Sequence, residues 1–239
     1  MKSRQPLLVV LALYLLASVP ATLHAQSAPD GNRLQLGADS LYVYRIARGD
    51  TVATGRILER LATVVVGGER RIQRIYITAD EGMGAEVDSI EDTMESLEPR
   101  RLRVLQRNRD ILVRFTGDSA LGYSKSPFQA SAPVAAALAP GVIDGFSFDM
   151  YLRAADLALG RRFDLTVYDP SARKLTPTSA EVVGDERVAG VPSWHLRGRF
   201  GEMPVEFWIA KDGRRLRRQL IYPTPGLGIL FVTEPLGRQ

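Results

Sequence analysis

The chain has 239 residues, of which 45% are hydrophobic and 24% are charged, and its formal net charge is +4. This composition is typical of a folded globular protein with enough apolar residues for a sizeable core. Because the chain contains no cysteine, disulfide bonds, thiol nucleophiles, thiolate metal sites and lipid-modified cysteine anchors are excluded.

Residues 1–25 have the pattern of an export signal. Lys2 and Arg4 supply a basic amino-terminal region, and 7–17 is an unbroken apolar run. That run is shorter than the about 20 residues that a membrane-spanning helix needs, and it suits the hydrophobic part of a signal peptide. We expect cleavage after Ala25, with an uncleaved anchor as the alternative. The mature chain, 26–239, is then expected to be a single periplasmic domain with flexible ends and no transmembrane span.

The charge of the mature chain argues against nucleic-acid binding. Loss of Lys2 and Arg4 with the signal lowers the formal charge from +4 to +2. An exported chain with nearly balanced charge lacks the basic footprint of a nucleic-acid-binding domain. We therefore expect no nucleic-acid partner.

Short strands with turn signals between them run through the mature chain. Apolar or alternating segments predict strands at 41–46, 57–66, 71–78, 101–105, 111–115, 163–168, 181–183, 194–200, 205–210 and 216–222. Gly67-Gly68 supplies the positive φ angles of a tight turn and predicts a hairpin between the second and third of these segments. Asn108–Asp110 predicts a turn between the next two. Short strands at this spacing favour a barrel or a sandwich.

An acidic run precedes a basic one. Residues 80–98 hold eight acidic residues and no basic one, and five arginines follow within 100–109. Calcium prefers carboxylate oxygens, but the ordered spacing of a calcium loop is missing. We expect strand faces paired with the neighbouring arginines, a calcium site being the alternative. Four apolar residues also fit a helix, so strand or helix stays open for 86–98: Val87, Ile90, Met94 and Leu97.

One helix is predicted near the middle of the chain. The segment 126–152 is rich in Ala, Pro and Gly and holds only two charged residues. Ser147 has the chemistry of an N-cap for a helix over 148–157, and Gly160 marks a stop. Three residues share one face at helical spacing: Phe148, Leu152 and Ala155. We expect this helix to cover the apolar face of the sheet.

The segment 193–222 permits a prediction of strand register. Gly201-Glu202 fits the two-residue loop of a type II′ turn. It places one set of pairs on an apolar face: Trp194–Ile209, Leu196–Phe207, Gly198–Val205 and Phe200–Met203. It places a second set on a polar face: Arg197–Glu206 and His195–Trp208. Asp212-Gly213 has the chemistry of a type I′ turn, which sets Trp208 against Arg217 and leaves Arg218 unexplained on the apolar face.

Short motifs that resemble catalytic signatures lack their partners. The segment 117–121, with Ser119, resembles the nucleophile block of certain esterases, but position 192 is Pro where the Asp of an Asp-x-x-His195 motif would stand. Ser171-Ala-Arg-Lys174 matches a Ser-x-x-Lys motif, but it lies between strands and no Lys-Thr-Gly follows. We therefore expect no enzyme.

Histidine and arginine residues are assigned to the sheet surface. His195 is the only histidine of the mature chain, and metal sites usually need more ligands of this kind, so we expect a polar strand residue. A basic run could meet anionic lipid, but a plain sheet surface is the favoured interpretation: Arg214, Arg215, Arg217 and Arg218.

Six short stretches carry a resemblance to a known family. They are Tyr42-x-Tyr44, Gly49-x-x-x-Ala-Thr-Gly55, Leu97-Glu-Pro99, Asp149–Ala154 ahead of Leu157–Gly160, Val182–Val188 and Phe207–Leu216. With the export signal, they resemble a domain-of-unknown-function family of bacterial periplasmic proteins, similar in architecture to the lipoprotein-carrier half-barrels (LolA- and LolB-like). The resemblance implies a mainly β fold: a curved antiparallel sheet, an open or half barrel, with one or two short helices covering the concave face. It brings no catalytic residues.

The predicted function is that of a non-enzymatic periplasmic protein whose apolar cavity binds a lipid or a lipidated partner, the carrier role being an analogy of fold. The predicted ligand-binding residues are Trp194, Leu196, Phe200, Val205, Phe207, Ile209, Phe148 and Leu152. The alternative is a structural or interaction module of the cell envelope with a filled core and a protein partner. Neither prediction involves a metal or another cofactor.

Overall fold

The computed structural model describes residues 28–80, 84–127 and 129–234. The strands of the first arm of the sheet are β1 (Gly37–Ala47), β2 (Asp50–Val66), β3 (Glu69–Asp80), β4 (Gly84–Thr93), β5 (Pro99–Gln106), β6 (Arg109–Phe115), β7 (Ser119–Ser126) and β8 (Gln129–Ala137). Those of the second arm are β9 (Ile143–Asp144), β10 (Arg162–Asp169), β11 (Lys174–Val188), β12 (Val191–Phe200), β13 (Met203–Ala210), β14 (Leu216–Thr224) and β15 (Leu227–Val232).

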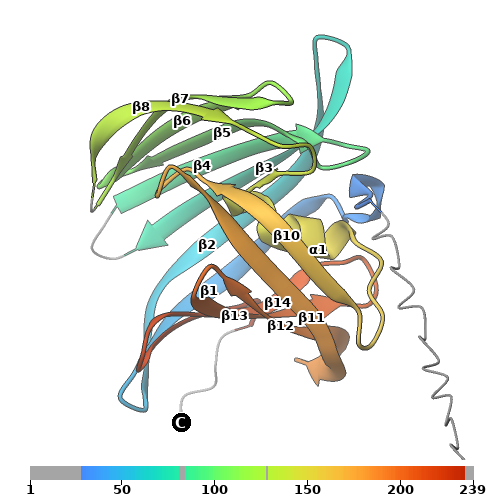
Figure 1. The fold of residues 1–239 in the computed structure, drawn as a ribbon. Helices are drawn as coiled ribbons and strands as arrows, with labels where there is room; N and C mark the ends of the chain where they lie inside the picture. The colour runs from blue at the N-terminus through green and yellow to red at the C-terminus, as the bar shows by residue number, and fades with distance from the viewer. Residues whose placement is uncertain (1–27, 81–83, 128, 235–239) are drawn as a thin grey trace, which may run out of the picture.

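All of these strands belong to one curved sheet (Figure 1). The order is β8-β7-β6-β5-β4-β3-β2-β1-β15-β14-β13-β12-β11-β10-β9, and neighbours are antiparallel except β9 and β10. Consecutive strands therefore pair with each other, apart from β8 and β9, and the pairing of β1 with β15 joins the two arms. The described sheet has β8 and β9 as free edges and is not closed into a barrel. The prediction of a mainly β, open half-barrel is confirmed.

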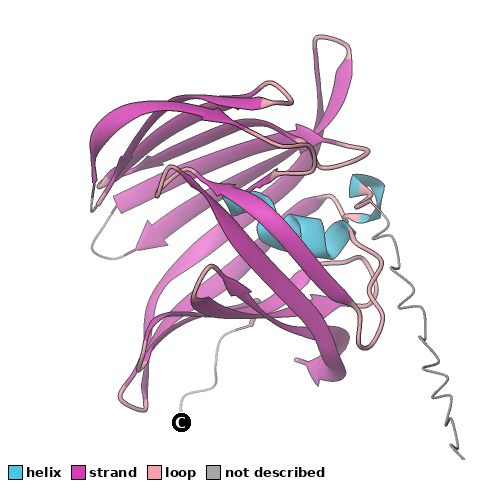
Figure 2. Ribbon diagram, in the orientation of Figure 1, coloured by secondary structure: helices cyan, strands magenta, loops and turns pink. Residues whose placement is uncertain are grey.

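In the described ranges three short helices accompany the sheet, the 3₁₀ turns η1 (Gly31–Arg33) and η2 (Gly145–Ser147) and the α-helix α1 (Phe148–Ala154). Figure 2 shows α1 between the two arms, on the concave side of the sheet. The predicted helix begins at the expected residue but ends earlier, because Ala155 is already extended with ψ 162°. Ser147 stands at the N-cap position without capping the helix through its side chain.

The first arm contains the predicted hairpins with some differences. Gly67 and Gly68 both have positive φ, and Val66 pairs with Glu69 as a two-residue turn requires. The loop after β5 is one residue earlier than predicted, since Gln106 already pairs with Arg109. Strands β7, β8, β9 and β15 were not predicted. Alanine, with its low strand propensity, dominates the end of β8.

The acidic segment is a strand over most of its length. Strand β4 ends at Thr93 and a turn follows. Along it, Ile90 is buried and Val87 is exposed, which is the alternation of a strand and not the single face of a helix. The helix reading of 86–98 is therefore wrong for the part that β4 covers.

The register predicted for β12 and β13 is confirmed at every pair. The next hairpin differs, because a bulge sits where the register shifts between Trp208 and Ile209. Ile209 pairs with Leu216 as predicted, but Trp208 pairs with Arg218 and not with Arg217. The loop places its positive φ angles on residues 213 and 214, so it is not the predicted type I′ turn. The bulge turns Arg218 onto the polar face, where its guanidinium lies 5.1 Å from the Trp208 ring centre.

Two apolar clusters fill the concave side, one under each arm. The cluster under the first arm includes Ile72, Ile90 and Leu102 and takes Met150 from α1. The cluster under the second arm takes the opposite side of the helix, including Leu152. One seven-residue helix therefore divides the interior between the arms.

Candidate functional site

The eight predicted ligand-binding residues come together, but as packed core. Six are buried in the cluster under the second arm: Leu196, Val205, Phe207, Ile209, Phe148 and Leu152. Trp194 and Phe200 are half-buried and pack against it. The Phe148 and Phe207 rings meet edge to face, with centroids 5.5 Å apart, a favoured geometry for aromatic pairs. Side chains of α1 thus occupy the space against this face of the sheet.

The side of α1 that faces the first arm carries charges. Arg74 of β3 donates from Nη1 to Oδ1 of Asp149 at 2.6 Å, and it also donates to the carbonyl oxygen of Phe146. Arg153 donates from Nη1 to Oε1 of Glu59 on β2 at 2.8 Å. We call these four charged residues the anchor network: Glu59, Arg74, Asp149 and Arg153. All four are buried.

Further contacts tie the anchor network together. Arg153 lies 3.5 Å from Asp149 within the helix, and it donates from Nε to the carbonyl oxygen of Arg214 at 2.9 Å. Burial raises the pKa of Asp149, but the neighbouring Arg74 and Arg153 outweigh burial and hold the pKa below its ordinary value. Buried charges need such pairing, because an isolated one is costly. The network therefore fixes α1 against the first arm.

Two further carboxyl groups lie at the start of the helix. Ser147 donates its hydroxyl to Oδ2 of Asp92 at 2.7 Å, while Oδ1 of Asp92 has no hydrogen-bond partner among the described residues. Burial raises the pKa of Asp92 to about 7. Burial, helped by the nearby Asp92, also raises the pKa of Asp144 well above its ordinary value. Neither carboxyl forms an ion pair with a described residue, and burial shifts both of them toward the protonated, neutral form.

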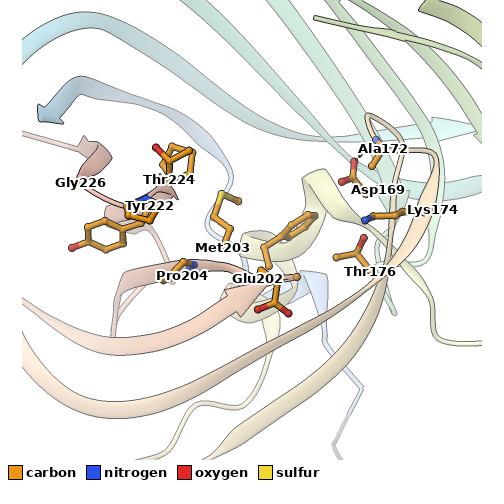
Figure 3. A pocket seen from close by; sticks show the side chains of 14 residues that line it. Asp169, Ala172, Lys174, Thr176, Glu202, Met203, Pro204, Tyr222, Thr224 and Gly226 are labelled. Carbon is orange, nitrogen blue, oxygen red and sulfur yellow. Dashed lines mark hydrogen bonds between the residues drawn. The ribbon is translucent and has the colours of Figure 1, made fainter. Parts of the chain in front are cut away.

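A pocket of about 670 Å³ opens at the mouth of the concave side (Figure 3). We call it the mouth pocket. Its walls come from three hairpin ends that are distant in sequence: β10–β11, β12–β13 and β14–β15. Its apolar and aromatic lining consists of Ala172, Phe200, Met203, Pro204, Tyr222, Pro223 and Pro225.

Charged groups stand at the rim of the mouth pocket. They belong to Asp169, Lys174 and Glu202. Asp169 accepts hydrogen bonds from the backbone of the turn that follows it, and Glu202 pairs with Arg199 at 2.7 Å. Lys174 forms no ion pair with any residue of the described ranges. Figure 3 shows its ammonium group turned toward the pocket, so a free cation stands beside an apolar wall.

Phe200 connects the mouth pocket to the interior. Its ring approaches η2 so closely that a Cβ at Gly145 would lie 3.0 Å from it. Phe200 and Met203 face each other in the register, and both pack against the cluster under the second arm. The floor of the pocket therefore rests on the same core that the helix fills. Of the eight predicted residues, Phe200 alone lines this pocket.

The catalytic-looking motifs lie in turns or at strand ends. Ser119 begins β7 and its hydroxyl contacts that of Thr116. Ser171 lies in the turn between β10 and β11, and Lys174 begins β11. His195 stacks on Trp208 with ring centroids 4.4 Å apart, and its Nε2 is 2.7 Å from a carboxylate oxygen of Glu206. His195 therefore occupies the predicted place on the polar face.

The acidic and basic runs pair with each other. Glu91 contacts both Arg71 and Arg101, in agreement with the expected strand faces. Within the described residues no group of three or more His, Asp or Glu side chains is placed to hold a metal ion. In the second basic run, Arg215 pairs with Asp39 and Arg217 with Glu234. No helix in the described part of the chain is long and apolar enough to cross a membrane.

The anchor network and the mouth pocket were not predicted. An arginine within an alternating strand segment is typical of a surface position, and Asp149, the partner of Arg74, lies 75 residues away. The mouth pocket joins three turns that no local pattern connects. The one usable signal was Asp149 and Arg153, four residues apart in an otherwise uncharged helical segment.

Comparison with known proteins identifies a family and a fold. Residues 44–230 match the family described as "Protein of unknown function (DUF3108)". No curated protein matches the chain. The crystal structure of a β-barrel-like protein of domain of unknown function DUF1849 from Brucella abortus is similar with a TM-score of 0.52 at 10% identity, over 84% of this chain and 97% of that one. A candidate lipoprotein from Parabacteroides distasonis gives a TM-score of 0.34 at 8% identity, over 87% and 98%.

Proposed function

The chain belongs to the DUF3108 family of proteins of unknown function, and we propose that it is a non-enzymatic periplasmic protein that binds an amphiphilic ligand in the mouth pocket. The ligand is a lipid or the acyl chain of a lipidated partner. Its apolar chain lies against Phe200, Met203 and Tyr222, and its anionic head group faces Lys174. One observation carries this proposal: an open apolar wall stands beside the ammonium group of Lys174, which forms no ion pair with a described residue.

The size of the mouth pocket suits this role. Its volume of about 670 Å³ is within the range of about 300–1,000 Å³ that is common for small-molecule sites. Full burial of a sixteen-carbon chain would gain on the order of 12 kcal/mol, against an association cost of about 4–15 kcal/mol. Because the pocket is open and covers a chain only in part, we expect weak and reversible binding.

The packed interior moves the proposed site away from the concave face. Leu196, Phe207 and Leu152 are fully buried against one another, so a ligand could reach them only if α1 left its place. In this proposal those residues support the floor of the mouth pocket, and Phe200 contacts the ligand. The likeness to the LolA- and LolB-like carriers stays a prediction.

The filled core also favours a second candidate function. A structural or interaction module of the envelope needs a rigid interior and no ligand, and the apolar cluster with its buried helix would supply that. The two candidates differ in one observable, which is whether the protein carries a bound amphiphile.

Native mass spectrometry of 26–239 purified from a bacterial periplasm separates the two candidates. We expect a reproducible mass excess that disappears after solvent extraction and appears in the extract as lipid. A bare protein mass, combined with no binding of added dodecanoate, would contradict the proposal and favour the interaction module.

Variants of the mouth pocket locate the ligand. Met203→Asp places a charge on the apolar wall, and we expect it to abolish binding of a dansylated fatty acid. Leu175→Asp is the matched control, because Leu175 is exposed on β11 and is not among the lining residues. Lys174→Glu should weaken binding of dodecanoate and leave dodecanol unaffected. Equal affinities for wild type and Met203→Asp would contradict the assignment.

A further inference from the structure

The outward face of the first arm carries an apolar row. Successive strand residues point to opposite faces, so the positions that alternate with the buried residues of β2–β5 point away from α1. Four of them lie side by side in register across these strands. We call them the apolar row: Leu58, Ile77, Val87 and Leu105. They are 39–52% exposed, which is unusual for neighbouring apolar residues at the surface of a monomer.

The same outward face is basic. The outward positions of β2–β7 include seven basic residues: Arg56, Arg60, Arg71, Arg101, Arg103, Arg114 and Lys125. They include three acidic residues: Glu69, Glu91 and Asp110. An excess of positive charge therefore surrounds the apolar row.

The acidic residues of this face are already neutralised. Glu69 and Glu91 each contact two arginines, and Asp110 contacts one. Arg56 donates a hydrogen bond to Ser40, and three of the basic residues form neither an ion pair nor a side-chain hydrogen bond with another described residue: Arg60, Arg114 and Lys125. These three belong to β2, β6 and β7. The free cations are thus spread over the width of the arm.

We infer that this outward face docks on an anionic phospholipid bilayer. An apolar surface framed by cations matches the boundary between anionic phosphates and acyl chains. Guanidinium groups donate paired hydrogen bonds to phosphate oxygens. Tyr42 and Tyr123 also stand at outward positions, and tyrosine is frequent at membrane interfaces. The wide spread of the free cations fits a charged plane better than a single acidic segment of a protein partner.

This inference does not depend on the mouth pocket. The docking residues lie on the first arm and the pocket residues on the second. A protein that binds no amphiphile could still dock, and a protein that holds one could fail to dock. Met203→Asp should therefore leave vesicle binding unchanged, which keeps the two proposals separable.

A single-cysteine probe tests the docking directly, because the natural chain has no cysteine. Leu105→Cys, labelled with the fluorophore NBD, should shift its emission to the blue when phosphatidylglycerol vesicles are added. Leu159→Cys is the matched control, since Leu159 is 70% exposed and lies outside the sheet. Phosphatidylcholine vesicles should shift neither label. No shift at position 105, or an equal shift at both positions, would overturn the inference.

Charge reversal supplies the second measurement. In co-sedimentation, Arg60→Glu combined with Arg114→Glu should weaken binding to phosphatidylglycerol vesicles at least about tenfold, given the attraction of each basic residue to an anionic surface. Arg199→Glu, on the second arm, should bind as the wild type does. Added salt should release the wild type, because it screens exposed charges. The inference would be overturned if the wild type formed dimers in solution and Leu105→Asp were monomeric. That result would assign the apolar row to self-association.

Discussion

The two sides of α1 hold the same helix by different means. Toward the second arm the helix presents aromatic and aliphatic side chains, and Phe148 meets Phe207 edge to face. Toward the first arm it presents Asp149 and Arg153, which pair with Arg74 and Glu59. The apolar side gains from area removed from water, roughly in proportion to that area. The charged side gains little net energy but demands one geometry.

This difference explains how a helix of seven residues stays in place. A helix this short is marginal on its own and depends on tertiary contacts. Apolar packing alone would tolerate sliding or rotation, because hydrophobic attraction has no direction. The paired hydrogen bonds of Arg74 and Arg153 allow one position and one rotation. The apolar contacts thus supply most of the free energy that holds the helix against the sheet. The anchor network fixes the position and the rotation of the helix.

Substitution of Arg74 should have the largest effect on the stability that the anchor network provides. Arg74→Met leaves Asp149 and the carbonyl of Phe146 without their donor, and loss of one partner from a buried ion pair costs about 3–5 kcal/mol. We expect that loss in the free energy of unfolding measured in urea. Arg114→Met on the outward face is the control, with an expected change below about 0.5 kcal/mol. Equal effects of the two substitutions would contradict the role of the anchor network.

The buried carboxyl of Asp92 makes stability depend on pH. Its pKa of about 7 in the folded state is above its ordinary value, so the folded protein holds a proton that the unfolded chain has released between pH 4 and 7. Stability is therefore highest at the acidic end of this window and falls as the pH rises through about 7. The difference is on the order of 4 kcal/mol at 1.36 kcal/mol per pKa unit.

Asp92→Asn tests this dependence, because the amide still accepts the Ser147 hydrogen bond but does not ionise. We expect the variant to be more stable than the wild type at pH 8 and to lose most of the slope between pH 4 and 7. The raised pKa of Asp144 acts in the same direction and should leave a remainder. A wild type whose stability rises between pH 5 and pH 8 would be evidence against a buried, protonated Asp92.

A double-mutant cycle measures the direct coupling of Arg153 with Glu59. Groups in one buried network are expected to couple by about 0.5–3 kcal/mol. Glu59→Gln and Arg153→Met should each destabilise the protein, and the combined variant should lose less than the sum of the two. Additive losses would mean that the 2.8 Å contact does not hold the helix.

Substitutions on the apolar side of α1 should destabilise the protein less than substitutions in the anchor network. Phe207→Leu keeps an apolar group against Phe148 but loses part of the ring volume, and we expect it to cost less than the about 3–5 kcal/mol of a full Phe-to-Ala truncation. Thermal unfolding of Phe207→Leu and Arg74→Met should show a smaller loss of stability for Phe207→Leu. A greater loss for Phe207→Leu than for Arg74→Met would reverse the roles given to the two sides.

Local sequence patterns were sufficient to predict the structure where it depends only on adjacent strands and the turn between them. The register of β12 and β13 follows from the Gly201-Glu202 turn and from alternation, and every predicted pair is present. The bulge beside Trp208 was not predicted. The sequence did give one indication of it, because the predicted register placed the charged Arg218 on the apolar face. Correcting the register by one residue resolves that conflict.

The candidate site could not be predicted because it depends on contacts distant in sequence. The prediction that the helix covers the apolar face of the sheet is confirmed, but the alternation in β12 and β13 does not reveal that side chains of α1 fill the space against that face. Arg74 in a strand has the same local pattern as a surface arginine, until the topology places Asp149 opposite it. The mouth pocket collects turn residues from three hairpins, and only Phe200 belonged to a predicted binding face.

Labelled methionine methyl groups test the central claim that a ligand binds at the mouth while α1 stays in the concave face. Met203 lines the mouth pocket, and Met150 is a fully buried residue of α1 that packs under the first arm. In a titration of 26–239 with dodecanoate followed by NMR, the account predicts that the Met203 methyl signal shifts and the Met150 signal stays. A shift at Met150 would mean that the helix yields to the ligand, and an unchanged Met203 would mean that the mouth pocket is not the site.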